Sequence, residues 1–206
     1  LNEDGSYTIY TKASNLKSCV EVENASKSSG ANVQQYESNG NACQHWILEE
    51  TTAAGVKLDT SQVYQFQNAN SALYLEVKDA SAEAGANVQQ WGANGNDCQN
   101  WTLKEFGDGY YYILSRLGDG KTYYLDVAEG KGDDGTNIQI FTNTKTSAQL
   151  FKFIPNPDGT YYIVTRASKD KGALGVAAAS KEQGANVLQW TKNGSMDQMW
   201  NITAIG

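Results

Sequence analysis

The chain has 206 residues, a formal net charge of −7 at pH 7 and a sequence pI near 4.7. This length suffices for a buried core, whereas the negative charge argues against partners such as nucleic acid or an anionic membrane surface. No apolar run approaches the roughly 20 residues of a membrane helix, so we expect a soluble protein that binds a neutral ligand without membrane insertion.

Two short phrases each occur four times along the chain. The first phrase begins at Gly30, Gly85, Gly135 and Gly184, so its copies are 55, 50 and 49 residues apart. The second phrase has its aromatic residue at Trp46, Trp101, Phe151 and Trp200, with the same three spacings. Two motifs that keep one register indicate four copies of a unit of roughly fifty residues.

Each unit is predicted to contain four short strands. Apolar residues two positions apart, typical of the buried face of a strand, mark the first strand. These pairs are Tyr7 and Ile9, Tyr64 and Phe66, Tyr111 and Ile113, and Tyr161 and Ile163. The second strand covers 20–22, 75–77, 125–127 and 174–176, and the third strand covers the Asn-Val-Gln part of the first phrase. The fourth strand holds Trp46 and Leu48, Trp101 and Leu103, Phe151 and Phe153, and Trp200 and Ile202.

The connections between these strands carry turn signals. Asp-Gly dipeptides at residues 4–5, 108–109 and 158–159 predict turns into three of the units. Asn-Gly dipeptides at 39–40, 94–95 and 193–194 predict tight hairpins between the third and fourth strands. Because no stretch shows a sustained period of 3.6 residues, any helix should be a short turn and the fold class is all-β.

The unit resembles the Gln-x-Trp repeat of ricin B-type lectins and of related carbohydrate-binding modules in bacterial glycan-degrading enzymes. The stretches that carry the resemblance include Leu125-Asp126-Val127, Asn87-Val88-Gln89-Gln90-Trp91 and Gln99-Asn100-Trp101. The resemblance spans essentially the whole chain. It implies a β-trefoil, in which three units surround a pseudo-threefold axis and each unit can carry one shallow sugar site.

The resemblance also implies the residues of each sugar site. An acid in the second strand accepts hydrogen bonds from sugar hydroxyls, a glutamine in the third strand assists, and an aromatic residue two positions later stacks on the sugar. The candidate carbohydrate-binding residues are Glu21, Gln34 and Tyr36; Glu76, Gln89 and Trp91; and Asp126, Gln139 and Phe141. The fourth copy has Gly175 and Leu188 at the first two positions, which leaves Trp190 alone, so we expect that site to be inactive.

The sequence departs from the family pattern at one further sugar-ligand position. The residue before the glutamine of the second phrase is often Asn in the family, and here it is Cys43, Cys98, Ala148 or Asp197. Two copies also carry Glu where Asp is usual. A galactose-type specificity therefore does not follow from the resemblance.

Structural roles compete with binding roles at several of these positions. The glutamines and aromatics of the second phrase are predicted to hold the core and to make no ligand contact. The acids Glu21, Glu76 and Asp126 interrupt apolar triplets, so a solvated surface acid is the alternative to a ligand role, and their recurrence favours the ligand role. The aromatics that end the third strands could pack under a loop or stack on a ligand, and Trp91 is the strongest candidate.

The sequence offers no pattern for catalysis, a metal site or a cofactor. His45 is the only histidine, and Cys19, Cys43 and Cys98 lack the paired spacing of a zinc site. We therefore predict that the protein is not an enzyme, with no catalytic residue, metal ion or cofactor. Cys19 and Cys43 flank one candidate site and could pair, whereas Cys98 is predicted to be a free thiol.

Four units exceed the three that close a trefoil. We expect residues 51–206 to form the three-repeat trefoil and residues 1–50 to form an extra repeat packed on it or on a neighbour. The alternatives are a trefoil at 1–153 with 154–206 appended, or one closed four-repeat domain over 1–206.

These patterns favour non-catalytic binding of a mono-, oligo- or polysaccharide. We expect a secreted or cell-surface module of a glycan-degrading enzyme or adhesin, whose other modules are further candidate partners. The alternative is a protein-interaction or inhibitory trefoil that acts through its loops.

Overall fold

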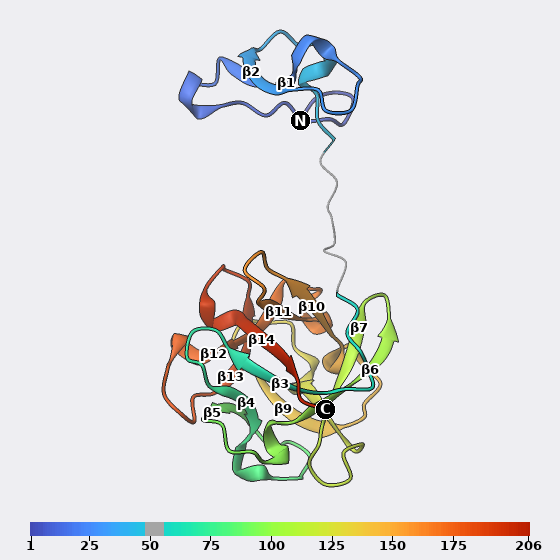
Figure 1. Cartoon of the computed structure of the whole chain (residues 1–206), viewed down its shortest axis with the longest axis vertical. Coiled ribbons are helices and arrows are strands. Elements are labelled where there is room, and N and C mark those ends of the chain that lie inside the picture. Colours follow the sequence, from blue (N-terminus) through green and yellow to red (C-terminus); the bar gives the residue numbers. More distant parts are fainter. Residues whose placement is uncertain (48–55) are drawn as a thin grey trace. The chain divides into compact units, whose positions relative to one another are not determined.

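The computed structural model describes residues 1–47 and 56–206 (Figure 1). Contacts divide the chain into two compact units, Leu1–Thr52 and Ala53–Gly206. The described residues form β-strands and three-residue 3₁₀ turns, and none of them forms an α-helix. The predicted all-β class is therefore confirmed.

The larger unit contains twelve strands, four from each of three repeats. Repeat 2 (residues 63–107) forms β3 (Val63–Asn68), β4 (Tyr74–Val77), β5 (Val88–Trp91) and β6 (Trp101–Gly107). Repeat 3 (residues 110–155) forms β7 (Tyr110–Ser115), β8 (Tyr123–Val127), β9 (Thr136–Thr142) and β10 (Phe151–Pro155). Repeat 4 (residues 161–204) forms β11 (Tyr161–Thr165), β12 (Gly172–Val176), β13 (Val187–Thr191) and β14 (Met199–Ala204).

The first and fourth strands of these repeats close a six-stranded antiparallel barrel. The ring runs β3–β6–β7–β10–β11–β14 and returns to β3, because β14 pairs with both β11 and β3. The second and third strands form three hairpins, β4–β5, β8–β9 and β12–β13, and β13 also pairs with β9. A barrel with three such hairpins is the β-trefoil that the resemblance implied.

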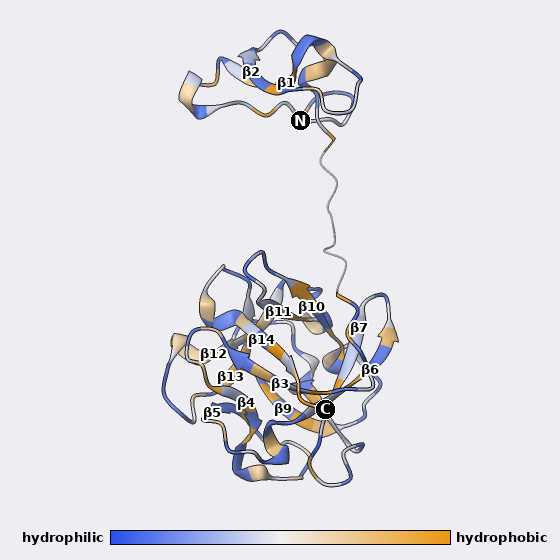
Figure 2. Cartoon of the chain, in the orientation of Figure 1, coloured by the Kyte–Doolittle hydropathy of each residue, from blue (hydrophilic) through white to orange (hydrophobic). Residues whose placement is uncertain are grey.

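Alternating apolar residues fill the barrel. Phe66, Ile113 and Ile163 from the first strands are fully buried, as are the fourth-strand residues Trp101 and Trp200. In Figure 2 the strongly hydrophobic positions of this unit lie mainly on its strands, while the connecting loops are mostly polar. Burial of each large side chain contributes about 1.5–3 kcal/mol, so these repeated positions supply much of the stability.

A buried glutamine stabilises the turn that follows the hairpin in each repeat. The Gln99 side chain accepts a hydrogen bond from the backbone N–H of Asn94 (3.2 Å) and donates one to the carbonyl oxygen of Gly92 (2.8 Å). The same two contacts join Gln44 to Asn39 and Glu37, Gln149 to Thr144 and Thr142, and Gln198 to Asn193 and Thr191. All four glutamines are at most 1% exposed, so their predicted structural role agrees with their burial.

The tryptophan of the second phrase ties its strand to the hairpin. The indole N–H of Trp101 donates to the carbonyl oxygen of Leu75 (3.2 Å), and that of Trp200 donates to Leu174 (3.0 Å). Phe151 fills the same buried position in repeat 3, where a phenyl ring has no N–H to donate.

The predicted hairpins at the Asn-Gly dipeptides are wrong. Gly95 and Gly194 do have positive φ angles, 71° and 83°, but each turn leads into a 3₁₀ segment instead of a hairpin. The third strand pairs with the second strand of its repeat, and the fourth strand joins the barrel. The dipeptide therefore redirects the chain from the hairpin to the barrel.

Three asparagines join the hairpins to one another. The Asn87 side-chain amide donates to Asn186 (2.9 Å), Asn186 donates to Asn137 (2.8 Å), and Asn137 donates back to Asn87 (2.9 Å). Each amide thus donates once and accepts once in a closed ring. Because the three residues are equivalent in their repeats, the ring marks the pseudo-threefold axis.

The smaller unit contains a single repeat, repeat 1 (residues 1–47). It forms one antiparallel hairpin, β1 (Ser18–Val22) with β2 (Val33–Glu37), and a bridge between Tyr7 and Trp46 replaces the predicted first and fourth strands within these residues. Leu48 lies outside the described residues. Tyr7 is 38% exposed, whereas its equivalent Tyr64 is 5% exposed, since repeat 1 has no closed barrel around it.

The asparagine ring generates a stability prediction. Replacing Asn137 with Ala removes one donated and one accepted hydrogen bond, and we expect the free energy of unfolding of the larger unit to fall by about 1–3 kcal/mol. Chemical denaturation measures this change. Asn32→Ala is the matched control, because Asn32 has the same place in repeat 1 and is exposed. Equal effects of the two substitutions would show that the ring does not stabilise the trefoil.

Candidate functional site

Strand register brings each acid and glutamine together. Glu76 of β4 lies directly opposite Gln89 of β5, and Asp126 of β8 lies opposite Gln139 of β9. Glu21 and Gln34 are paired in the same way in repeat 1. Since directly opposed residues of an antiparallel pair project from the same face, each pair meets on one side of its hairpin.

The Glu76 carboxylate is enclosed by donors. Gln89 Nε2 donates to Oε1 (2.9 Å), while Gln99 Nε2 (3.0 Å) and Asn94 Nδ2 (3.1 Å) donate to Oε2. The Cys98 thiol lies 3.9 Å from Oε2. These contacts fix the position of the carboxylate.

Repeat 1 has the same arrangement around Glu21. Gln34 Nε2 donates to Oε1 (3.0 Å), Gln44 Nε2 donates to Oε2 (2.9 Å), and the Cys43 thiol is 3.9 Å from Oε2. Tyr36, the aromatic residue predicted for this site, is 54% exposed.

The Asp126 carboxylate has a different electrostatic setting. Its side chain is one methylene shorter than glutamate, and Gln139 Nε2 donates to Oδ1 (2.9 Å). Burial raises the pKa of Asp126, and hydrogen bonds from Gln139 and Gln149 act in the opposite direction. The charged form is therefore less favoured here than for an ordinary aspartate.

The alternative of solvated surface acids is wrong. Glu21, Glu76 and Asp126 are 6%, 5% and 4% exposed, because the neighbouring glutamines and turns cover them.

Pockets lie above the acids of the larger unit. One of about 260 Å³ is lined by Glu76, Gln89 and Trp91, and Trp91 is 40% exposed. Another of about 540 Å³ is lined by Asp126, Gln139 and the half-buried Phe141. Each of these hairpins therefore gathers the acid, glutamine and aromatic residue named from the sequence.

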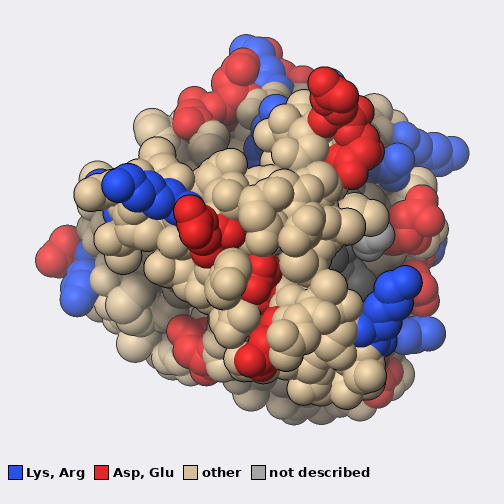
Figure 3. Space-filling view, turned by 90° about the horizontal axis from the view of Figure 1, so that it is seen from above, with Lys and Arg blue, Asp and Glu red and all other residues tan. Residues whose placement is uncertain are grey.

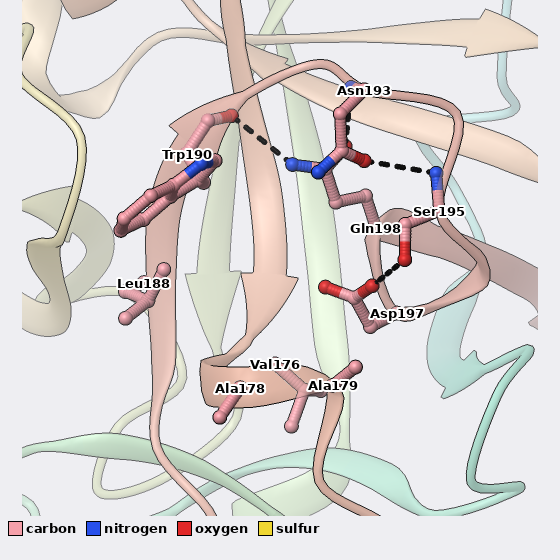
Figure 4. Close-up of a pocket in the computed structure, with 9 residues that line it drawn as sticks. All are labelled: Val176, Ala178, Ala179, Leu188, Trp190, Asn193, Ser195, Asp197 and Gln198. Carbon is pink, nitrogen blue, oxygen red and sulfur yellow. Dashed lines mark hydrogen bonds between the residues drawn. The ribbon is translucent and has the colours of Figure 1, made fainter.

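Repeat 4 lacks the acid and glutamine pair in its hairpin. Gly175 lies opposite Leu188, while Trp190 is 45% exposed. Trp190 nevertheless borders a pocket of about 350 Å³, which also contains Asp197 (Figure 4).

Sequence reasoning missed the residues that support the acids. Gln44 and Gln99 were predicted only to hold the core, yet both also donate to a site carboxylate, and Asn94 does so in repeat 2. The spacing of 23 residues between acid and glutamine recurs in repeats 1, 2 and 3, and this constant offset was the available signal.

Other candidate chemistry is sparse among the described residues. Cys19, Cys43 and Cys98 are free thiols, so the Cys19–Cys43 pairing is absent and the free thiol predicted at Cys98 is present. No three His, Cys, Asp or Glu residues within 1–47 and 56–206 form a metal-binding group, and no helix there is long and apolar enough to cross a membrane.

On the face drawn in Figure 3, acidic side chains lie among uncharged residues, and the Lys and Arg side chains lie at several separate places.

Comparison with known families gives one match over the chain. The model described as ricin-type β-trefoil lectin domain-like matches residues 1–62, 55–141, 119–190 and 147–206.

Known proteins resemble different portions of the chain. Among solved structures, the designed threefold-symmetric protein ThreeFoil is 34% identical, with a TM-score of 0.65 over 69% of this chain and 99% of its own. A ricin B-like lectin from Macrolepiota procera, solved with lactose, shares the fold at 16% identity, with a TM-score of 0.57 over 71% of this chain and 98% of its own.

A curated relative matches over a shorter stretch. The clotting factor G alpha subunit of Tachypleus tridentatus is 36% identical over 69 residues, which is 32% of this chain. The matched stretch covers only 10% of that subunit.

The burial of Asp126 generates a pH prediction. We expect its carboxyl to titrate above the ordinary aspartate pKa of 3.8, so the folded state keeps this proton at pH values where the unfolded chain has lost it. Stability contributed by this group should therefore fall as the pH rises between those two pKa values. Carbon-detected NMR of the side-chain carboxyls measures the titration.

Asp119 is the internal control for this measurement. Backbone hydrogen bonds from Lys121 and Thr122, together with the Thr122 hydroxyl, lower the pKa of this exposed aspartate. An Asp126 midpoint at or below that of Asp119 would contradict the role of burial.

Proposed function

The chain belongs to the ricin-type β-trefoil lectin domain-like family, and on that premise we propose that it is a non-catalytic carbohydrate-binding protein. The observation that carries the proposal is the preformed contact between each site acid and its glutamine, next to an aromatic side chain. The sites named from the sequence are the ones we assign to sugar.

The Glu76 carboxylate suits a sugar hydroxyl. A carboxylate offers about four lone-pair positions, two on each oxygen. Gln99 and Asn94 approach Oε2, whereas Gln89 is the amide donor to Oε1. Oε1 therefore keeps acceptor capacity for a ligand hydroxyl, and a hydrogen bond to an ionised group is stronger than one between neutral groups.

The neighbouring aromatic ring suits the apolar face of a sugar. Trp91 borders the same pocket as Glu76 and Gln89 and is 40% exposed, so its ring is available for stacking. Tyr36 and Phe141 are assigned the same role in repeats 1 and 3. Several weak sites on one chain raise avidity for a repeating glycan without any new contact.

We extend the proposal to the domain organisation of the chain and to the larger protein that would contain it. Residues 51–206 are assigned to a complete three-repeat trefoil and residues 1–50 to an additional repeat, and the closure of β14 on β3 supports this division. The chain is proposed to be a module of a larger secreted or cell-surface protein. An exo-β-1,3-galactanase from Clostridium thermocellum, 24% identical, shares the fold over 91% of this chain and 38% of its own (TM-score 0.65), which supports a modular setting.

Trp91→Ala tests the binding role. We expect affinity for a bound glycan to fall about tenfold, or about 1.4 kcal/mol, because the stacking surface is lost while the half-exposed ring contributes little to the core. Affinity electrophoresis and calorimetry with lactose, N-acetylgalactosamine and a β-1,3-galactan measure the change.

Phe106→Ala is the matched control. Phe106 is 48% exposed and lies at the end of β6, outside the pockets described above, so its loss should leave binding unchanged. Equal binding by wild type and Trp91→Ala, with thermal unfolding unaltered, would reject the assignment of this site. A protein partner retained after loss of all three aromatics would favour the loop-mediated alternative.

A further inference from the structure

Repeat 4 contains a formed pocket where the sequence predicted an inactive site. Its volume of about 350 Å³ falls within the range of small-molecule sites. Figure 4 shows Trp190 and Leu188 on one side, Asp197 and Ser195 on the other, and small apolar residues between them. The small apolar residues are Val176, Ala178 and Ala179.

A carboxylate occupies the place of the missing acid. A Cβ atom on Gly175 would lie 3.3 Å from Asp197 Oδ2, so this carboxylate fills the space above the glycine. Asp197 comes from the 3₁₀ turn Met196–Gln198 rather than from β12. The carboxylate of this pocket therefore comes from the turn before the fourth strand, whereas the site acids of repeats 1 to 3 come from the second strand.

Repeats 1 and 2 show that the positions equivalent to Gly175 and Asp197 are neighbours in space. Cys98 is equivalent to Asp197, and its thiol lies 3.9 Å from the Glu76 carboxylate. Cys43 has the same contact with Glu21. A carboxylate at either position can thus reach the same region, and repeat 4 uses the position that the other repeats give to a cysteine or alanine.

Local contacts orient the Asp197 side chain. The Ser195 hydroxyl donates to Oδ1, which leaves Oδ2 on the side of Gly175 (Figure 4). The backbone carbonyl of Asp197 accepts a hydrogen bond from Asn68 Nδ2 (2.8 Å), which anchors the turn to β3. The Gln198 amide donates to Thr191 (3.0 Å) and Trp190 (3.4 Å) carbonyl oxygens.

The opposite wall is less polar than in the other pockets of the larger unit. Leu188 takes the place of Gln89 and Gln139, and Ala178 takes the place of Asp79 and Glu129. The pocket therefore combines one oriented carboxylate and an exposed indole with aliphatic walls.

We propose that this pocket is a fourth sugar site, in which Asp197 replaces the absent strand acid and the aliphatic wall accepts a methyl-bearing substituent. The ligand class is a sugar that presents hydroxyls to Asp197 and an acetamido or 6-deoxy methyl group to Leu188 and Ala178. The inference rests on the proposed function, since Trp190 stacks on the sugar as Trp91 does in repeat 2.

The experiment titrates the full chain with single sugars and follows the indole N–H signals by NMR. Trp190→Phe and Trp91→Phe identify the two signals. We expect the Trp190 signal to shift with N-acetylglucosamine, N-acetylgalactosamine or L-fucose. The apparent dissociation constant from this shift should be at least fivefold lower than with glucose or galactose. A response to the acetamido sugars alone, or to L-fucose alone, identifies which methyl group the wall accepts.

Variants test the two halves of the pocket separately. Asp197→Asn should weaken the Trp190 response at least fivefold, and Leu188→Gln should remove the preference for methyl-bearing sugars. The matched control is Asp97→Asn, because Asp97 is an acid in the equivalent 3₁₀ turn of repeat 2 and does not line the repeat 2 pocket. Thermal unfolding of each variant shows whether the turn stays folded. If Asp197→Asn disrupts the turn, Leu188→Gln still tests the pocket.

The outcomes separate this inference from the proposed function. Responses of Trp91 without any response of Trp190 would overturn the fourth site and leave carbohydrate binding intact. An equal Trp190 response in Asp197→Asn that remains folded would overturn the role of the relocated carboxylate. If neither indole N–H signal shifts with any of these sugars or with the β-1,3-galactan, the result would count against the proposed function itself.

Discussion

In all four repeats, a buried glutamine amide holds the turn that leads from the hairpin to the fourth strand or, in repeat 1, to the bridge residue Trp46. Gln99 bonds backbone groups five and seven residues earlier, at Asn94 and Gly92, and its Nε2 also donates to the Glu76 carboxylate. One side chain therefore satisfies buried backbone groups and positions the acid that faces the pocket. Because the same amide serves both purposes, the geometry of a site and the integrity of its turn are coupled.

The asparagine ring acts between repeats, where the glutamine acts within one. Asn87, Asn137 and Asn186 each bond both neighbours, so the three hairpins share one polar junction. A single repeat contains only one member of this ring, and repeat 1 leaves Asn32 exposed and its hairpin residue Val33 53% exposed. The repeated sequence therefore encodes a core that becomes buried only when three copies meet.

The strands could be predicted because alternation and repeat spacing are local properties, as at Phe66 and Trp101. The partner of each strand could not, since an Asn-Gly dipeptide specifies a turn but not which strands pair across it. Burial of Glu76 also escaped prediction, because its donor Gln99 lies 23 residues away in the sequence. The family pattern placed Asp197 at a sugar-ligand position, but its closeness to Gly175 could not be predicted, because the two residues lie 22 positions apart in the sequence.

The glutamine of each second phrase, and the tryptophan in repeats 1, 2 and 4, bond mainly to backbone carbonyl and amide groups, which every amino acid except proline supplies in full. Trp200 still donates to the carbonyl of Leu174 beside Gly175, although the hairpin has lost its acid. These backbone contacts therefore persist in repeat 4, where the strand acid is missing, although the same glutamine amide also donates to the acid in repeats 1 and 2. If the pockets bind sugars as proposed, each can change its lining without loss of the backbone contacts that hold the barrel, so one chain could present unlike sites to the different branch ends of a heteropolymeric glycan.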